Sequence, residues 1–347
     1  MRYSQKMDVH SQGLTLHAVE EISETDLESL PDGLLAVEGP VVVRGALSQW
    51  PLVTAAKRSD EAAAQYLTQF YNGRPVNTII ADASEKGRFF YRETSKQLNF
   101  EASLESLSNV FAVLLDERRS KHPRAIAVQA MLASETLPGF EDANPNTLLP
   151  KRSPARLWIG NKATVAPHFD VADNLACVAV GRRRFVLFPP EQTANIYPGP
   201  MDVTPANVPI SMVSLDEPDF DRFPRYREAL AAAFVAELEP GDAIYIPYLW
   251  WHGVQSLSGF NVLVNYWWNR DDTLARHPYA ALLRAAHALY SGMSDEHRDA
   301  WRALYDYYVF HTHGDPMSAL SPAHHDSDRV DPERASQLKT VLQQLLR

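Results

Sequence analysis

The sequence is poor in cysteine and in long apolar runs. Its 347 residues include one cysteine, Cys177, so neither an intramolecular disulfide nor a zinc site built on several cysteines can form. No stretch approaches the length of a membrane span, and residues 1–13 lack the apolar segment of a signal peptide. These absences predict a cytoplasmic protein that has no membrane partner.

Basic residues are fewer than acidic ones. Lys and Arg number 33 and Asp and Glu 43, which gives a net charge of −10 with histidine neutral. Binding to nucleic acid without sequence preference needs a basic surface that releases counterions. The charge therefore argues against a nucleic-acid partner, and the 45% content of hydrophobic residues is that of a globular protein.

Three parts of the chain differ in pattern. Residues 1–124 mix short β-branched runs with helical stretches, so we expect an α/β segment that packs on the core. Residues 125–272 contain short β-type runs that close on Gly or Pro, which is typical of an antiparallel barrel or sandwich. An insertion rich in Pro and Asp interrupts these runs at about 191–232, and residues 273–347 turn helical.

The last helical stretch is amphipathic, and an exposed apolar face needs a partner that buries it. A second copy of the chain is one candidate, which would make the protein a homodimer through its C-terminal helices. The apolar residues of this face are Leu338, Val341, Leu342, Leu345 and Leu346.

A histidine and an aspartate stand one residue apart in "APHFDVADNLACVAV", residues 166–180. Side chains at i and i+2 of a strand point to the same face, so His168 and Asp170 can converge on one metal ion. Such a triplet is common by chance, so a third ligand is required. His252 is the candidate, because it follows a tight turn, a buried strand and two tryptophans in "PGDAIYIPYLWWH".

The purely structural interpretation of His252 is a core histidine surrounded by aromatic side chains. Two histidines and one carboxylate, however, form the facial triad that binds iron(II) and leaves positions open for oxygen and a co-substrate. The remaining histidines have no carboxylate partner at strand spacing, and we expect them at the surface. They include His10, His17, His122, His311, His313, His324 and His325.

Several motifs follow one another in a specific order. They are "GPVVVRGALSQWPL", "HFDVADNLACVAVGRRRFVLFPP", "DEPDFDRFP", "LEPGDAIYIPYLWWHGVQSL" and "VLVNYWW". Together they resemble the JmjC/cupin-like (cupin_8) oxygenases that depend on iron(II) and 2-oxoglutarate, and most closely the asparaginyl hydroxylases of that family. The resemblance covers roughly residues 35–272, and the C-terminal helices resemble the family's dimerisation region more loosely.

The resemblance implies a mainly β fold with flanking helices. Its core is a double-stranded β-helix, which is a jelly roll of the cupin or JmjC type, and a C-terminal helical extension follows. His168, Asp170 and His252 match the metal ligands of the family. Arg183 matches a basic residue that pairs with the distal carboxylate of 2-oxoglutarate, and strand alternation gives it the opposite sense to its two neighbours. Residues near the co-substrate are matched by Asn174, Asn265 and Trp267.

Two hydroxyl groups that bind this carboxylate in the asparaginyl hydroxylases are missing. Val165 stands at the position of a threonine, and Val128 is aligned with a tyrosine. The loss of two donors to a buried carboxylate costs about 1–3 kcal/mol each if nothing replaces them. Tyr91 is a candidate replacement. The sequence therefore predicts weak binding of 2-oxoglutarate, another donor, or a different co-substrate.

The expected activity is hydroxylation of a protein side chain or a small molecule, with iron(II), 2-oxoglutarate and O2. If the C–H bond adjoins nitrogen, the same reaction ends as demethylation. Asp170 occupies the position that related halogenases leave open for chloride, which favours hydroxylation. One alternative is a cupin-like metal- or metabolite-binding protein or sensor without turnover, and the two valines support it. Another is metal-dependent chemistry without 2-oxoglutarate, against which Arg183 argues.

Overall fold

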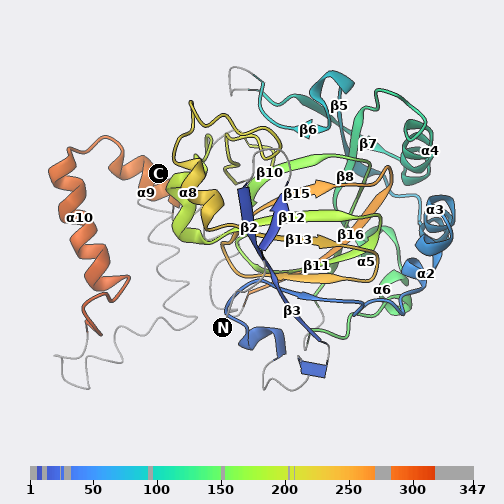
Figure 1. The fold of residues 1–347 in the computed structure, drawn as a ribbon, viewed down its shortest axis with the longest axis horizontal. Helices are drawn as coiled ribbons and strands as arrows, with labels where there is room; N and C mark the ends of the chain where they lie inside the picture. The colour runs from blue at the N-terminus through green and yellow to red at the C-terminus, as the bar shows by residue number, and fades with distance from the viewer. Residues whose placement is uncertain are drawn as a thin grey trace. The chain divides into compact units, whose positions relative to one another are not determined.

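The computed structural model describes most of the chain. The described residues are 6–9, 14–23, 25–26, 33–92, 97–149, 153–201, 204–206, 208–269 and 283–316. The chain divides into two compact units, Met1–Arg270 and Asp271–Arg347. The larger unit contains the strands, and the smaller one contains helices (Figure 1).

The first of two sheets has seven strands, of which four consecutive ones pair antiparallel with one another. Its strands are, in spatial order, β1 (Lys6–Val9), β2 (Leu14–Ala18), β13 (Phe234–Leu238), β12 (Arg183–Phe188), β15 (Trp251–Ser256), β10 (Thr164–Phe169) and β6 (Arg88–Phe89).

The second sheet has nine strands and carries the longest buried strand of the protein, β11. Its strands are, in spatial order, β3 (Glu20–Ile22), β4 (Val41–Val43), β14 (Ala243–Ile246), β11 (Asp173–Val180), β16 (Asn261–Trp268), β9 (Ala155–Gly160), β8 (Ala125–Leu132), β5 (Val76–Ala81) and β7 (Phe100–Glu105).

From β9 to β16 the chain alternates between the two sheets, except that β12 and β13 are neighbours in the first sheet, and this is the winding of a jelly roll. Side chains that meet between the sheets include Ala176, Phe185 and Val254, and these form one apolar cluster. The expected mainly β fold with flanking helices and a double-stranded β-helix core is therefore confirmed.

The opposite face of the second sheet is covered by helices. The buried side of α2 (Pro51–Arg58), α3 (Asp60–Thr68) and α4 (Leu107–Glu117) joins a large apolar cluster with β9, β11 and β16. Both faces of β11 are thus buried, which explains its unbroken apolar run. Cys177 lies in this cluster as a small core residue.

Short helices fill the connections between the longer elements. A 45-residue connection between β12 and β13 packs on the first sheet: Ser211 donates its main-chain N–H to Pro167 O at 2.7 Å, and Thr193 accepts from Trp251 Nε1 at 2.9 Å. The short helices of the larger unit are η1 (Gly33–Ala36), η2 (Ala83–Glu85), α5 (Ala133–Thr136), α6 (Phe140–Ala143), η3 (Pro190–Gln192), α7 (Thr193–Ile196) and α8 (Tyr226–Ala231).

The smaller unit contains α9 (Arg284–Tyr290) and α10 (Asp295–Tyr308). Ser294 caps α10 by accepting from His297 N at 3.3 Å, and Tyr290 packs on Trp301. The predicted amphipathic stretch at 331–346 lies outside the described residues. Among the described helices, none is long and apolar enough to cross a membrane.

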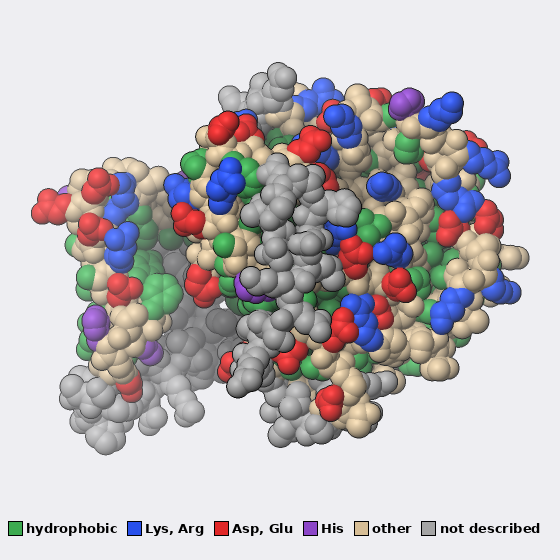
Figure 2. All heavy atoms as spheres, viewed as in Figure 1, with side chains coloured by type: hydrophobic (Ala, Val, Ile, Leu, Met, Phe, Trp, Pro, Cys, Tyr) green, Lys and Arg blue, Asp and Glu red, His purple; other side chains and the backbone are tan. Residues whose placement is uncertain are grey.

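Charges of both signs are interspersed on the surface. Figure 2 shows Lys and Arg side chains mixed with Asp and Glu side chains over the face in view. No broad area of a single charge is visible among the described residues on this face.

Candidate metal centre

Two adjacent strands bring the three predicted ligands together. His168 near the end of β10 and His252 near the start of β15 are Cα partners in antiparallel pairing, and their ring centroids lie 4.4 Å apart. Asp170 lies one residue beyond β10, with Oδ2 at 3.6 Å from His252 Nε2. The candidate ligand atoms of the three residues all lie within 4.8 Å of one another, so one metal ion can contact all three.

The local backbone is irregular where the ligands meet. A register shift in β10 between Val165 and His168 re-aims the end of the strand. Leu249 donates its main-chain N–H to Asp170 O at 3.2 Å and has a positive φ of 61°. A non-glycine residue in this conformation costs about 1–2 kcal/mol. The turn before His252 therefore keeps Leu249 in a backbone conformation that this residue disfavours.

Main-chain carbonyls orient both imidazoles. With Nδ1 as the donor, His168 bonds to Ala166 O at 3.0 Å and His252 bonds to Trp250 O at 3.1 Å. These bonds leave both Nε2 atoms free for a metal ion. Burial, and then the neighbouring His252, lower the pKa of His168 to about 4, so its imidazole is neutral at physiological pH. A neutral imidazole is the form that binds metal.

A chain of amide side chains supports the carboxylate of Asp170. Asn174 donates to Asp170 Oδ2 at 2.9 Å, and Asn265 donates to Asn174 Oδ1 at 2.7 Å. Trp267 is the cross-strand partner of Asn174. Within the part of the chain that the structure describes, Asn265 Oδ1 and Trp267 Nε1 are buried without a hydrogen-bond partner. Three of the residues expected near a co-substrate thus lie beside the metal ligands, and two of them have unused polar atoms.

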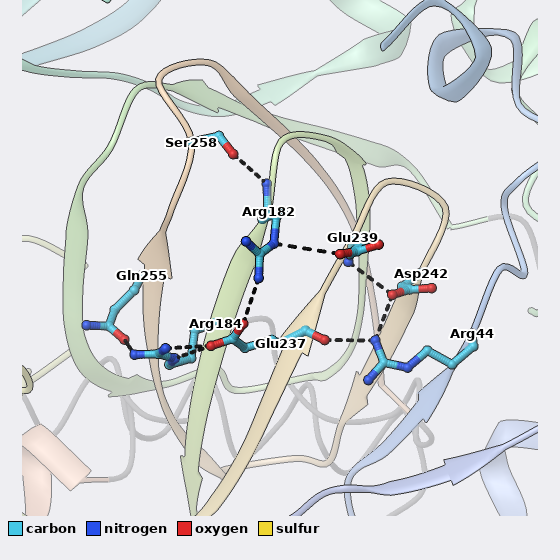
Figure 3. Close-up of polar contacts among 8 residues, drawn as sticks. All are labelled: Arg44, Arg182, Arg184, Glu237, Glu239, Asp242, Gln255 and Ser258. Carbon is cyan, nitrogen blue, oxygen red and sulfur yellow. Dashed lines mark hydrogen bonds and ion pairs between the residues drawn. The ribbon is translucent and has the colours of Figure 1, made fainter. Parts of the chain in front are cut away.

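The three consecutive arginines point to different sides of β12. Arg182 and Arg184 lie on the outer face, where each donates to the carboxylate of Glu237 at 2.9 Å (Figure 3). The side chain of Arg183 is on the same side of β12 as those of Phe185 and Leu187, which face the interior between the sheets. Alternation along the strand therefore places one buried guanidinium inside the barrel.

Arg183 is a buried cation that has no counter-ion among the described residues. Its side chain is 7% exposed, Nη2 donates to Trp158 O at 3.4 Å, and Nε has no hydrogen-bond partner. No carboxylate of the described residues pairs with it. Burial lowers the pKa of Arg183 to about 10, so it remains charged at neutral pH. An unpaired buried charge is costly to the folded protein, and a ligand carboxylate would offset this cost.

Val165 and Val128, which are aligned with the two missing hydroxyl residues, lie on different faces of the sheets. Val165 packs on the apolar cluster inside the barrel, as expected for the threonine position. Val128 lies opposite Ile159 in the cluster that faces the helices, so its alignment with an interior tyrosine is wrong. Side chains alternate along β8, and Ala127, on the other side of this strand, packs on a different apolar cluster that contains Ala125 and Phe89.

Tyr91 does not replace the missing hydroxyl groups at Arg183. Its ring packs with Ala166 and Ile210, on the side of β10 that faces the connection between β12 and β13. A Cβ at Gly199 would lie 3.1 Å from the Tyr91 hydroxyl oxygen, which places this oxygen next to the connection. Tyr91 therefore adds no hydroxyl group to the apolar wall around Arg183.

Comparison with known proteins gives a family match and several relatives. The model of the cupin-like domain family, Cupin_8, matches residues 28–274. The chain is 34% identical over 148 residues to HSPB1-associated protein 1 of Homo sapiens, which covers 42% of this chain and 30% of that protein. It is 31% identical over 162 residues to lysine-specific demethylase JMJ31 of Arabidopsis thaliana, covering 46% and 27%. The matches thus span less than a third of these two relatives.

A longer match is found with the bifunctional peptidase and (3S)-lysyl hydroxylase JMJD7 of Homo sapiens. The chain is 28% identical to it over 279 residues, which covers 70% of this chain and 81% of that protein. The family match spans more than half of the chain and includes all three candidate metal ligands. The protein therefore belongs to the cupin-like domain family, Cupin_8.

Proposed function

We propose that the protein is an oxygenase that depends on iron(II) and 2-oxoglutarate. The observation that carries this proposal is Arg183, a buried cation without a carboxylate partner among the described residues, in the same barrel as a group of two histidines and one carboxylate. A metal site alone fits many cupin-like proteins. A metal site that shares its barrel with an unpaired arginine fits a ligand that is both a chelator and a carboxylate.

The donor set fits iron(II). Two imidazole nitrogens and one carboxylate oxygen would bind the ion from one side, and no thiolate is near because Cys177 lies in the core on the other face of β11. Iron(II), 2-oxoglutarate and O2 together supply the oxidation of a substrate C–H bond, with loss of CO2 from the keto acid. The role of this chain is to orient the ligands through Ala166 O, Trp250 O and Asn174.

The position of Arg183 fits the far carboxylate of 2-oxoglutarate. Leu187 pairs with His252, so Arg183 lies four residues further along β12, roughly 13 Å deeper in the barrel. Val165 and Phe185 both pair with Val254, which lies between these two levels. The long arginine side chain and a five-carbon dicarboxylate can span the distance, and the apolar wall between them excludes water from the ion pair.

The proposed reaction is hydroxylation of a protein side chain or a small molecule. The likeness to asparaginyl hydroxylases, and relatives named as a lysyl hydroxylase and a lysine demethylase, favour a protein side chain. We propose a cytoplasmic homodimer that assembles through the C-terminal helices. Exposed apolar side chains on α10, including Trp301 and Leu304, support the dimer.

A second candidate function is metal or metabolite binding without turnover. It is favoured by Val165, because the interior wall beside Arg183 lacks the hydroxyl group expected there. Incubation of the iron(II)-loaded protein with 2-oxoglutarate and O2 separates the two functions. We expect succinate to form, measured by NMR, and His168→Ala to abolish its formation without unfolding the protein. Saturable binding of 2-oxoglutarate without succinate would favour the binding protein.

A further inference from the structure

A second arginine, Arg156, faces the interior of the barrel close to the metal ligands. It lies on β9, where Ala155 and Leu157 belong to the cluster on the helical side of the sheet. Arg156 therefore points to the opposite face, as does Trp158, which packs on the interior cluster. Cross-strand pairing places Arg156 beside Asn265, the end of the amide chain that begins at Asp170.

The guanidinium of Arg156 is held over an aromatic ring. Its Cζ lies 5.4 Å from the ring centroid of Trp267, and this ring packs edge-on against Trp158 at 6.3 Å. A cation–π contact holds a guanidinium in place without using its N–H donors. The side chain is only partly buried, so a ligand that enters the barrel can reach these donors.

Arg156 has no hydrogen bond and no ion pair with any residue that the structure describes. Other arginines of the larger unit, such as Arg44, Arg118 and Arg184, pair with carboxylates. Beside Arg156, Trp267 Nε1 is a buried donor without a described partner. A fork of N–H donors next to an unused indole N–H is complementary to the oxygens of a carboxylate.

We propose that Arg156, held by Trp267, binds a carboxylate of the prime substrate. The inference rests on the proposed function and names its substrate class. Once 2-oxoglutarate chelates a metal through its keto acid, it has one carboxylate left, and Arg183 accounts for it. The charges of iron(II), Asp170, 2-oxoglutarate and Arg183 then cancel. Arg156 adds one positive charge beside the metal, and an acidic substrate neutralises it.

The test compares an acidic probe with its neutral analogue. The probes are N-acetyl-L-glutamate and N-acetyl-L-glutamine, which differ by one carboxylate. Their binding to the full chain is measured by ligand-observed NMR, with zinc(II) in place of iron(II) and saturating 2-oxoglutarate. We expect the acidic probe to bind at least about tenfold more tightly, as is typical of hydrogen bonds to a charged group.

Three variants identify the residue responsible. Arg156→Gln removes the preference for the acidic probe, and Arg156→Lys, which keeps the charge, retains part of it. Arg88→Gln is the matched control, since Arg88 stacks on Phe90 at 4.6 Å outside the barrel, and it keeps the full preference. Circular dichroism confirms that each variant is folded.

The inference is overturned if the wild type shows no preference, either because both probes bind alike or because neither binds. It is also overturned if Arg156→Gln keeps the preference. Failure of the proposed function has a different signature, because iron(II) and 2-oxoglutarate then give no visible charge-transfer band in the wild type. A band together with equal binding of the two probes rejects only the assignment of Arg156.

Discussion

The direction of a single side chain decides what the barrel can bind. Arg182 and Arg184 share Glu237 on the outer face of β12 (Figure 3). Arg183 lies inside, where a main-chain carbonyl is its one hydrogen-bond partner among the described residues. A buried cation in this state destabilises the protein until a ligand pairs with it. Stability of the ligand-free protein and affinity for a carboxylate are therefore opposed at this residue.

Replacement of Arg183 by methionine tests this opposition. We expect Arg183→Met to raise the free energy of unfolding of the ligand-free protein by about 1–3 kcal/mol, because an unpaired buried charge is removed. Urea denaturation measures the change. Arg184→Met is the control, and it should lower the free energy by no more than about 1 kcal/mol, since its ion pair with Glu237 is partly exposed. Equal losses in both variants would contradict the account.

A hydroxyl group restored at Val165 should strengthen binding of the co-substrate. Val165 lies inside the barrel between the levels of His252 and Arg183, where a threonine can donate to a ligand carboxylate. We expect Val165→Thr to lower the Kd of 2-oxoglutarate about fivefold, which corresponds to about 1 kcal/mol. Val128→Thr, on the helical face, should leave the Kd unchanged. An unchanged Kd in Val165→Thr would show that the ligand carboxylate is elsewhere.

At the scale of elements, the metal ligands depend on strands that are distant in the sequence. Asn174 on β11 links Asp170, which follows β10, to Asn265 on β16. Each amide fixes the next, so the carboxylate of Asp170 is oriented from the second sheet. This arrangement explains why a ligand outside regular structure can hold its position.

Removal of the first amide should weaken the metal site. We expect Asn174→Ala to raise the Kd for iron(II) by 10- to 100-fold, the usual effect of a lost partner of a metal ligand. The Kd is measured anaerobically by competition with a chelator. Asn261→Ala removes a buried amide at the opposite end of β16, away from Asp170, and should leave the Kd unchanged. Loss of affinity in Asn261→Ala alone would refute the role of the amide chain.

The sequence predicts those parts of the site that depend on alternation within one strand. The opposite sense of Arg183 and its neighbours follows from the period of two. The spacing of His168 and Asp170 correctly predicts that they converge, although Asp170 lies one residue beyond β10. The alignment of Val128 with an interior residue is wrong, and β8 contains a register shift after this residue, with Ala130 at a φ of +46°, that breaks the simple alternation. Arg156 carries no motif, and its role depends on Trp267, which is 111 residues away in the sequence and adjacent only in the sheet.

At the scale of the whole molecule, the smaller unit presents apolar surface that a monomer does not need. Trp301 is 42% exposed, Leu304 47% and Tyr308 58%, and all three lie on α10. Apolar side chains that gather on one helix are typical of a surface that binds another protein. A second copy of the chain is the simplest partner for them.

Removal of the C-terminal helices should dissociate the proposed dimer. We expect the chain without residues 273–347 to be monomeric or insoluble, because it lacks the helices proposed to form the interface. Size-exclusion chromatography with light scattering measures the mass. The full-length double variant Trp301→Ser and Leu304→Ser should weaken the dimer in the same way without a deletion. A shortened chain that is as oligomeric as the full one would exclude this interface.

The central claim is that a metal ion and the guanidinium of Arg183 bind the two ends of one molecule of 2-oxoglutarate. Anaerobic titration of 2-oxoglutarate into the iron(II)-loaded protein tests it directly, because a keto acid that chelates iron(II) produces a visible charge-transfer band. We predict a saturable band in the wild type that Arg183→Ala loses and Arg184→Ala keeps. Iron that binds without a band, or a band that persists in Arg183→Ala at the same Kd, would contradict the account.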